Sequence, residues 1–367
     1  MTATSDVIVI GAGVVGAACA RALALAGARV TVLRRAGEGE AWRAAAGMLA
    51  AQVEAGPEDP LFNLAIAGRA FYVREAERLR DTTGIDIGLA QTGILHVAFS
   101  DAQVTAFKTK VAWQRQQAQR ADWLEPDEIR ESWSFLAPGL GGLWAAEDGS
   151  LDPVALVEAL LADATRLGAR LVDDAAVAID RTGEALHGVI GTTGRYAAAH
   201  VIIAGGAWGG RLDNLPRPLS VEPVRGQMVA IDWPHGAPAV VAYGDRCYVL
   251  RRGSEMLVGS TMEHAGFDAT TTEAGIAELI ARASVLHPAL ASTTIRRRWA
   301  GLRPGTPDGV PIIGPEPRLP GLWYAAGHGR NGVLLAGITG EMLAQAIGGE
   351  ALPDELHPAR PTRFWSW

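Results

Sequence analysis

The first 35 residues place two apolar runs on either side of an alanine-rich segment. Residues 7–10 are continuously apolar, which is typical of a strand buried on both faces of a parallel sheet. Residues 14–26 have helical character, and Gly27 is expected to end that helix. Residues 29–33 form a second short strand. The order of strand, helix and strand predicts a βαβ unit at the start of the chain.

A similar alternation returns in the middle of the chain. Asp152 is a good helix N-cap and Pro153 suits the first helical position, so a helix is expected as far as residue 168. Short strands are expected after it near 170–172 and 177–179. Residues 201–204 are again apolar throughout, which indicates another strand of a parallel sheet.

Residues 220–257 have a different pattern, in which strand-like runs are separated by turn residues. Residues 101–120 are polar with spaced apolar positions, which predicts an exposed amphipathic helix of the same inserted domain. The last 20 residues contain three prolines and are expected to form an irregular tail. The strand-like runs that begin within residues 220–257 predict an antiparallel sheet, with strands at 221–231, 239–243, 248–250 and 256–259.

Composition narrows the class of protein. With 367 residues and 49% hydrophobic content, the chain can form more than one domain of average size. A formal net charge of −7 leaves no broad basic surface for nucleic acid. Cys19 and Cys247 are too few for a disulfide framework or a thiolate metal cluster, so we expect no metal site and a reducing cytoplasm. The apolar stretches are too short or too interrupted to span a bilayer, so no membrane partner is expected.

The motif GAGVVG at residues 11–16 joins the first strand to the first helix. In this position it directs backbone N–H groups at a pyrophosphate, so we expect a bound dinucleotide. The second strand normally ends in an Asp or Glu that binds the ribose hydroxyls, but this chain has Arg34, followed by Arg35. Either both arginines bind a 2′-phosphate, which would indicate NADP, or they lie on the surface and other groups hold the ribose.

Further motifs lie far from this one along the chain. Residues 44–49, AAAGML, are small enough for a flat ring system to lie close to the backbone. Residues 299–309, 312–314 and 326–332 read WAGLRPGTPDG, IIG and AGHGRNG. With the glycine motif, they resemble the glycine oxidase and D-amino acid oxidase-like flavoproteins, in particular the glycine oxidase branch associated with thiamine biosynthesis. The resemblance covers nearly the whole chain.

This resemblance implies an α/β plus α+β fold, in which a Rossmann-like FAD-binding domain carries an inserted, mainly antiparallel substrate domain. FAD is then favoured over NADP and is expected to bind non-covalently, with its flavin ring between the two domains. The FAD-binding domain would comprise residues 1–90, 140–215 and 300–367, and the substrate domain residues 91–139 and 216–299. The residues expected to hold FAD are Gly11, Gly13, Val14, Val15, Gly16, Arg34, Arg35, Ala45, Ala46, Gly47, Met48, Leu49, Val177, Ala204, Gly205, Trp208, Gly301, Arg303, His328, Gly329, Arg330, Asn331, Gly332 and Val333.

The resemblance also implies roles at the substrate. Arg303 is expected to pair with the substrate carboxylate, because a guanidinium offers two parallel donors to two oxygens. Tyr248 would bond the same carboxylate, and Met262 would form an apolar wall of the pocket. Arg330 belongs to the loop that would cover the flavin.

Two positions depart from the pattern of the family. Gly329 stands where an aromatic residue is usual between His328 and Arg330, and Arg246 stands where a histidine is common before Cys247. The first change opens volume beside the flavin, and the second adds a cation. The sequence therefore indicates a substrate larger than glycine with a further anionic group, unless both changes are neutral.

The implied activity is the oxidation of glycine or an N-substituted glycine, including an N-carboxymethyl amino acid, to glyoxylate and an amine. Oxygen would be reduced to hydrogen peroxide. One alternative is a D-amino acid or sarcosine-type dehydrogenase with another electron acceptor. A second is a non-catalytic flavin-binding redox scaffold. The quaternary state, monomer or homo-oligomer, is left open.

Overall fold

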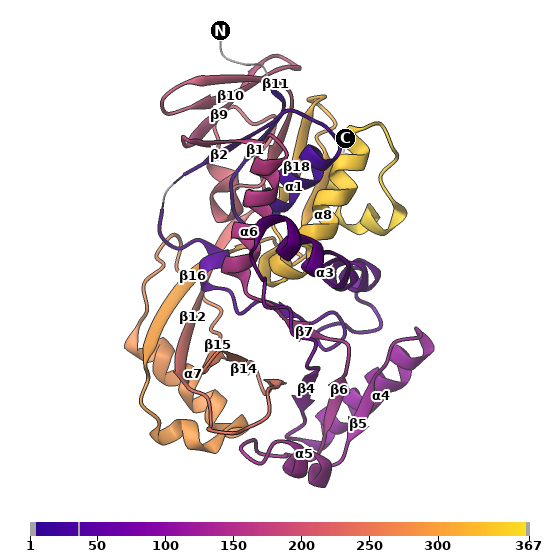
Figure 1. Cartoon of the computed structure of the whole chain (residues 1–367), viewed down its shortest axis with the longest axis vertical. Helices are drawn as coiled ribbons and strands as arrows, with labels where there is room; N and C mark the ends of the chain where they lie inside the picture. The colour runs from indigo at the N-terminus through magenta and orange to yellow at the C-terminus, as the bar shows by residue number, and fades with distance from the viewer. Residues whose placement is uncertain (1–4, 36, 365–367) are drawn as a thin grey trace.

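The structure is a computed structural model that describes residues 5–35 and 37–364. These residues form two large sheets of eight strands each, and β3 (Met48–Leu49) and β7 (Gly149–Ser150) form a third, two-stranded sheet. In Figure 1 the first large sheet and its helices occupy the upper half of the molecule, and the second large sheet occupies the lower half. The α/β plus α+β class expected from the sequence is confirmed.

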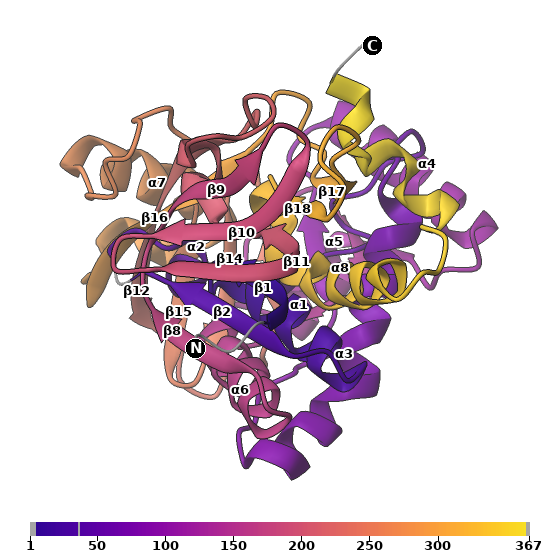
Figure 2. The ribbon, with the colours of Figure 1, turned by 90° about the horizontal axis from the view of Figure 1, so that it is seen from above.

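The first sheet has a parallel centre. Strand β1 (Ser5–Ile10) pairs in parallel with β2 (Val30–Arg34) on one side and with β11 (Arg195–Ile203) on the other. The strands predicted from the apolar runs are therefore confirmed. The antiparallel strands β9 and β10 lie at the end of the molecule that faces the viewer in Figure 2. The remaining strands of this sheet are β8 (Arg170–Asp173), β9 (Ala176–Thr182), β10 (Ala185–Gly191), β17 (Ile312–Pro315) and β18 (Leu322–Ala326).

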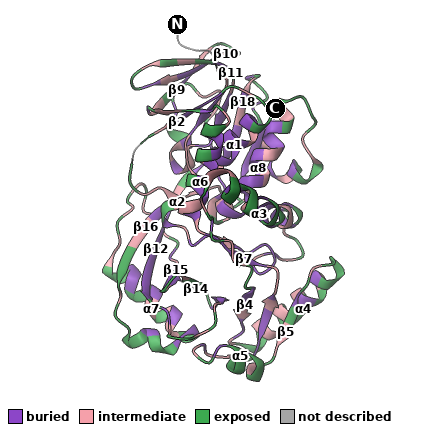
Figure 3. Ribbon diagram, viewed as in Figure 1, coloured by how far each residue is buried: buried purple, intermediate pink, exposed green. Residues whose placement is uncertain are grey.

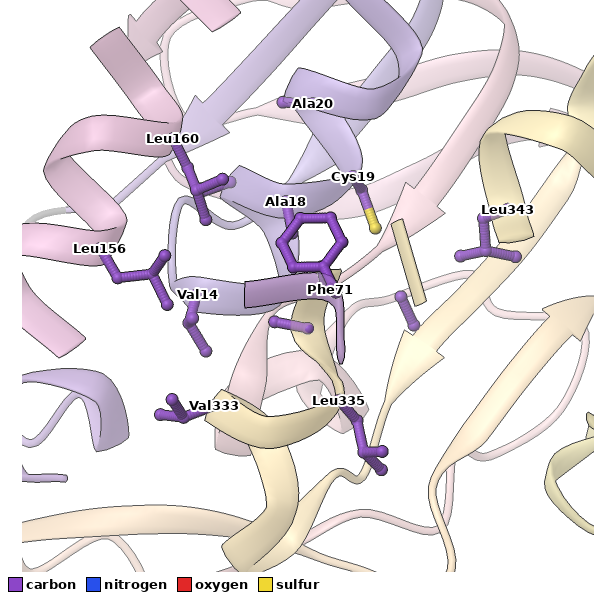
Figure 4. Packing of buried hydrophobic residues seen from close by; sticks show 14 of the residues in the cluster. Val14, Ala18, Cys19, Ala20, Phe71, Leu156, Leu160, Val333, Leu335 and Leu343 are labelled. Carbon is purple, nitrogen blue, oxygen red and sulfur yellow. The ribbon is translucent and has the colours of Figure 1, made fainter. Parts of the chain in front are cut away.

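Helix α1 (Val14–Leu25) is buried at the centre of the larger core, between α6 (Pro153–Arg166) and α8 (Gly332–Ile347). Figure 4 shows its apolar side chains facing those of α6 and α8. The helices approach closely because α8 carries Gly340, where a Cβ would lie 2.7 Å from the backbone of Ala18. This packing holds the start of α1 in a fixed position at the end of β1. The other helices of this half are α2 (Ala41–Ala44) and α3 (Phe62–Thr83).

The second sheet is antiparallel except where β13 pairs in parallel with β4, as the turn-separated pattern predicts. Helix α7 (Glu273–Leu286) packs near the β16 end of the sheet, and α4 (Asp101–Gln116) and α5 (Pro126–Ser132) lie near the β5 end (Figure 1). In order across the sheet, the strands are β16 (Arg297–Gly305), β12 (Glu222–Asp232), β15 (Glu255–Gly259), β14 (Tyr248–Arg252), β13 (Val241–Tyr243), β4 (Ile94–Val97), β6 (Gly142–Ala145) and β5 (Asp122–Leu124).

Three sequence expectations need correction against these elements. Strand β6 belongs to the second sheet, although the expected cofactor-binding segment begins at residue 140, and β16 runs across the expected boundary at 300. Apolar runs identify strands but not the sheet that receives them. The expected irregular tail forms two 3-10 helices, Asp354–Ala359 and Pro361–Phe364, because Leu356 packs into the larger core.

Burial follows this arrangement. Figure 3 shows buried residues along both large sheets and in α1 and α8, whereas α4 and α5 expose much of their surface. The predicted exposed helix at 101–120 is thus observed as α4, which ends at residue 116. Within the described ranges, no helix combines the length and the apolar character needed to cross a membrane.

Candidate active site

One large cavity, with a volume of 970 Å³, is lined by residues of both large sheets. The glycine motif and the start of α8 line it from the first half of the molecule, and strands β12, β14 and β16 line it from the second. The cavity therefore joins the two parts of the chain in which the sequence predicts functional residues.

Backbone geometry explains the first glycines of the motif. Gly11 has φ +105°, and a Cβ on it would lie 2.4 Å from the carbonyl oxygen of Ala204. At Gly16 a Cβ would lie 1.9 Å from the carbonyl oxygen of Gly11. Gly13 precedes α1 and supplies no side-chain cap, so the N–H groups of the first turn remain available for an anion.

A second helix start faces the same cavity. Helix α8 begins at Gly332, and Asn331 before it makes no side-chain cap. His328 is buried beside this turn, with Nε2 3.2 Å from the Thr339 hydroxyl, and burial lowers its pKa to about 4, so the ring is neutral at pH 7. The positive end of α8 therefore faces the cavity without a competing side chain.

These features fit FAD. Two uncapped helix starts can serve the pyrophosphate and the electron-rich end of a reduced ring. The Cys247 thiol lines the cavity, but burial raises its pKa to about 11, which keeps it protonated and unreactive at pH 7. This state agrees with the non-covalent binding expected from the sequence.

The two adjacent arginines point in different directions at the end of the cavity that is expected to receive the ribose. Arg34 turns to Asp173, with Nε 2.5 Å from Oδ1, and does not line the cavity. Arg35 lines it, and its guanidinium carbon lies 4.3 Å from the ring centroid of Trp208. Since successive residues of a strand point to opposite faces, one of two adjacent arginines must point away. Asp173 therefore holds the Arg34 side chain away from the cavity, and Arg35 is the arginine that faces it.

Arg303, on β16, is a partly buried cation without an acidic partner within 4 Å among the described residues. Its Nη2 donates to the Ser260 hydroxyl at 2.6 Å, and its Nη1 donates to the Thr261 carbonyl at 3.2 Å. Among the described residues, no carboxylate lies within 4 Å of it. Burial lowers the pKa of this guanidinium, although it stays charged. A charge of this kind is costly unless it is paired, so the site is suited to an anionic ligand.

Two glycines on neighbouring strands make room for the predicted carboxylate-binding residues. A Cβ at Gly226, on β12, would lie 2.0 Å from Nη1 of Arg303, and one at Gly259, on β15, would lie 2.4 Å from the hydroxyl of Tyr248. The guanidinium and the phenol thus occupy space that side chains of adjacent strands would otherwise fill. Burial raises the pKa of Tyr248, so its hydroxyl is a neutral donor. We call Arg303 and Tyr248 the carboxylate clamp.

A second polar group lies beside the clamp. The Tyr243 hydroxyl donates to Oε1 of Glu54 at 2.7 Å, and Nε of Arg330 lies 2.6 Å from Oε2 of the same carboxylate. The charge of Arg330 is therefore neutralised by Glu54, which leaves the charge of Arg303 available in the cavity. Arg330 itself remains 58% exposed.

Most of the residues predicted from the sequence line this cavity. Besides Arg34, three do not: Gly16 packs against Gly11, Leu49 lies in the larger core, and Val177 points outward while Ala176 lines the cavity. The predicted residues that do line it are Gly11, Gly13, Val14, Val15, Arg35, Ala45, Ala46, Gly47, Met48, Ala204, Gly205, Trp208, Arg246, Tyr248, Met262, Gly301, Arg303, His328, Gly329, Arg330, Asn331, Gly332 and Val333.

Several residues of the cavity were not predicted from the sequence, among them Glu54, His96, Lys110 and Tyr243. Glu54 follows a short strand in irregular chain and has no periodic signal. Lys110 had a periodic signal in the sequence, because it shares a helix face with Phe107 and Gln103 in α4. An exposed amphipathic helix gives no reason, however, to place one of its faces in a cavity.

Comparison with known proteins gives a consistent result. Residues 6–346 match the model of a family described as FAD dependent oxidoreductase. The chain is 34% identical to a glycine oxidase of Geobacillus kaustophilus, with 99% of this chain and 98% of that protein covered. The crystal structure of glycine oxidase from the same species superimposes with a TM-score of 0.93 over all of both chains.

Two further relatives widen the comparison. The chain is 36% identical to the bifunctional protein ThiO/ThiG of Nostoc sp., and the match covers 94% of this chain but only 53% of that protein. Iminodiacetate oxidase from Chelativorans sp. BNC1 is 26% identical, with a TM-score of 0.89 and coverage of 97% of this chain and 98% of that chain.

Proposed function

The chain belongs to the family of FAD dependent oxidoreductases, and from this premise we propose that it oxidises the amine of glycine or an N-substituted glycine. The protein belongs to the class of FAD-dependent amino acid oxidases. The observation that supports the substrate proposal is the clamp. Arg303 is partly buried, charged and without an acidic partner within 4 Å among the described residues, and it shares the cavity with the expected cofactor residues. A non-catalytic flavin scaffold would have no use for such a residue.

The protein contributes orientation. Arg303 binds the substrate carboxylate, and the neutral Tyr248 hydroxyl donates a hydrogen bond to it, so that Cα is held toward the cofactor. Bound FAD supplies a two-electron acceptor for the Cα–H bond, and water hydrolyses the resulting imine to glyoxylate and an amine. Arg303 and Tyr248 do not exchange protons with the reacting atoms in this scheme.

We propose oxygen as the final electron acceptor, with hydrogen peroxide as the product. A dehydrogenase would need another acceptor, such as a quinone. Stoichiometric peroxide during aerobic turnover would support the oxidase, and flavin that stays reduced in air until a quinone is added would support the dehydrogenase.

The pocket has room for a substituent on the amine nitrogen. Gly329 has φ +53°, and a Cβ on it would meet no atom nearer than the Pro304 carbonyl oxygen at 4.0 Å. A relative of similar fold is named for iminodiacetate, which is an N-carboxymethyl glycine. An N-substituted glycine, including an N-carboxymethyl amino acid, is therefore proposed as a substrate in preference to glycine.

Anaerobic flavin bleaching tests this proposal. Glycine, sarcosine and larger N-alkyl glycines are compared by kcat/KM, and the larger substrates are expected to be preferred. Gly329→Phe should reverse the preference by filling the open volume, whereas the matched control Gly329→Ala adds the same backbone strain without a ring. Equal loss in both variants would show that backbone strain, and not volume, determines the result. Bleaching by none of the substrates would overturn the proposed function.

The location and assembly of the enzyme stay predictions. We propose a cytoplasmic enzyme, because both cysteines are buried and unpaired. Sedimentation of the holoenzyme would decide between a monomer and a homo-oligomer.

A further inference from the structure

A second unpaired cation lines the cavity at a distance from the clamp. Gln103, Phe107 and Lys110 lie on one face of α4 and reach the cavity from that helix. Helix α4 packs beside β5 and β6, whereas Arg303 lies on β16 at the opposite edge of the second sheet (Figure 1). The two side chains nevertheless face one part of the cavity, because Glu54 and Arg330 act on the pKa of both Lys110 and Arg303.

Lys110 has donors to spare. Its Nζ donates to the Val53 carbonyl at 2.7 Å, and none of the ion pairs within 4 Å among the described residues includes it. Burial lowers its pKa to about 8, and the more distant carboxylates of Glu54, Asp148 and Asp59 act in the opposite direction. An ammonium has three N–H donors, so two remain for a ligand. The other cations at this part of the cavity are neutralised: Arg330 pairs with Glu54, and Arg282 pairs with Glu278. Arg246 lines the cavity but is exposed. Lys110 is the better candidate, because burial strengthens the interaction between two charges.

A neutral partner lies next to this lysine. His96 lines the cavity, and burial together with the nearby Lys110 charge lowers its pKa to about 4. A hydrogen bond to the backbone of Gly244 raises the pKa in the opposite direction, and Nδ1 is buried without a hydrogen-bond partner among the described residues. Such an orphaned polar atom is uncommon and indicates a ligand or water at that position. The rings of Phe107 and Tyr243 flank the His96 ring, with centroids 4.3 Å and 5.6 Å away, and form an apolar wall beside it.

The choice of lysine here is also unusual for this chain. Of its 33 basic residues only Lys108 and Lys110 are lysines, both in α4. Lys108 is exposed, with Nζ 4.7 Å from the ring centroid of Trp123 and 3.9 Å from Glu125. The other lysine is therefore a matched internal control, on the same helix but outside the cavity.

We propose that Lys110, beside the neutral ring of His96, binds a second carboxylate of the substrate, carried on the nitrogen substituent. The preferred substrates are then dianionic N-(carboxyalkyl) glycines, with one carboxylate at Arg303 and the other at Lys110. This inference rests on the proposed function, because it extends the substrate of the same site. The sequence predicts Arg246 as the additional cation, but this side chain is exposed. We assign the role to Lys110, which is more buried.

Matched substrates test the charge. N-carboxymethyl, N-(2-carboxyethyl) and N-(3-carboxypropyl) glycine are each compared with a neutral N-alkyl glycine of similar length. One of the dianionic compounds should exceed its neutral partner about 10- to 100-fold in kcat/KM, as expected for one hydrogen-bonded ion contact. Lys110→Met should lower kcat/KM for the preferred dianionic compound by this factor and so remove its advantage over the neutral compound. Lys108→Met should change neither value.

A second readout does not depend on turnover. Incorporation of lysine labelled with ¹³C at Cε would label only Lys108 and Lys110 and leave their ammonium groups unmodified. The signal of Lys110 should shift when succinate or glutarate is added to the oxidised holoenzyme and should not shift with propionate, whereas the signal of Lys108 should stay constant. This measurement uses the native chain, so it remains decisive if Lys110→Met does not fold.

The outcomes separate the two proposals. If glycine or neutral N-alkyl glycines bleach the flavin but no dianionic compound is preferred, and the Lys110 signal does not move, the inference about Lys110 is wrong and the proposed function stands. If no compound of either series bleaches the flavin, the proposed function itself fails.

Discussion

Replacing Arg303 by alanine is the most direct test of the active site. The guanidinium is partly buried and its hydrogen-bond partners in the protein are a hydroxyl and a carbonyl, so most of its interaction energy is available to a bound carboxylate. Loss of one partner of a buried charge pair costs about 2 to 5 kcal/mol. At about 1.4 kcal/mol for each factor of ten, kcat/KM should fall roughly 30- to 5,000-fold.

Flavin binding should survive this change, because Arg303 contacts Ser260 and Thr261 in the second sheet and makes no bond to the glycine motif. The assay measures anaerobic flavin reduction by stopped flow, together with the flavin content of the purified protein. Arg297→Ala is the matched control: Arg297 lies on the same strand but is exposed and paired with Glu255, so less than about 1 kcal/mol is expected.

Gly226→Ala provides a second perturbation of the same group. The added methyl would lie 2.0 Å from Nη1 of Arg303, so the guanidinium must move although its charge remains. A loss similar to that of Arg303→Ala would show that position matters as well as charge. Near-normal kcat/KM in Arg303→Ala with a carboxylate substrate would refute the reasoning, because another cation would then anchor it.

Three further outcomes are expected. Arg35→Ala should weaken FAD, measured by flavin fluorescence, because its cation lies over Trp208 in the cavity, whereas Arg34→Ala should leave the affinity within about twofold, since an exposed ion pair contributes little. The unfolding free energy in urea should fall as pH drops from about 6.5 to 4, because the unfolded state protonates His328 before the folded state does. This residue contributes up to about 1.4 kcal/mol per pH unit. If His328→Gln leaves the dependence of the unfolding free energy on pH unchanged, the ring is not buried in its neutral form. Gly259→Ala should lower kcat/KM by displacing Tyr248 while leaving flavin bound, and retention of full activity would show that the phenol has no role.

Local patterns predicted the elements of the fold well. The βαβ unit, the helix after Asp152 and the antiparallel strands all depend on periodicity, caps and turn residues, which a sequence displays directly. Sheet membership was less accessible. Strand β6 joins the second sheet because its partners β4 and β5 lie there, and no local property of residues 142–145 indicates those partners.

The same distinction applies to the residues of the candidate site: local motifs predict some of them, and others come together only in the packed chain. Motifs predicted the residues near the cofactor because glycines at helix starts have a backbone reason. Where prediction missed by one residue, as at Leu49 beside Met48, the strand alternation determined which side chain faced the cavity. Glu54, His96 and Lys110 could not be predicted together, since they come from three separate segments that only the packed chain brings to one cavity.

The clamp and the wall formed by α4 differ in how freely they can be altered. Arg303 on the edge strand β16 and Tyr248 on the inner strand β14 extend into gaps left by Gly226 and Gly259. Their rotamers are therefore limited before substrate arrives, and little side-chain entropy is lost on binding. Gln103, Phe107 and Lys110 extend from a helix at the periphery of the second sheet. A mutant library confined to these three positions would therefore vary the accepted nitrogen substituent and leave the anchoring of the amino acid end untouched.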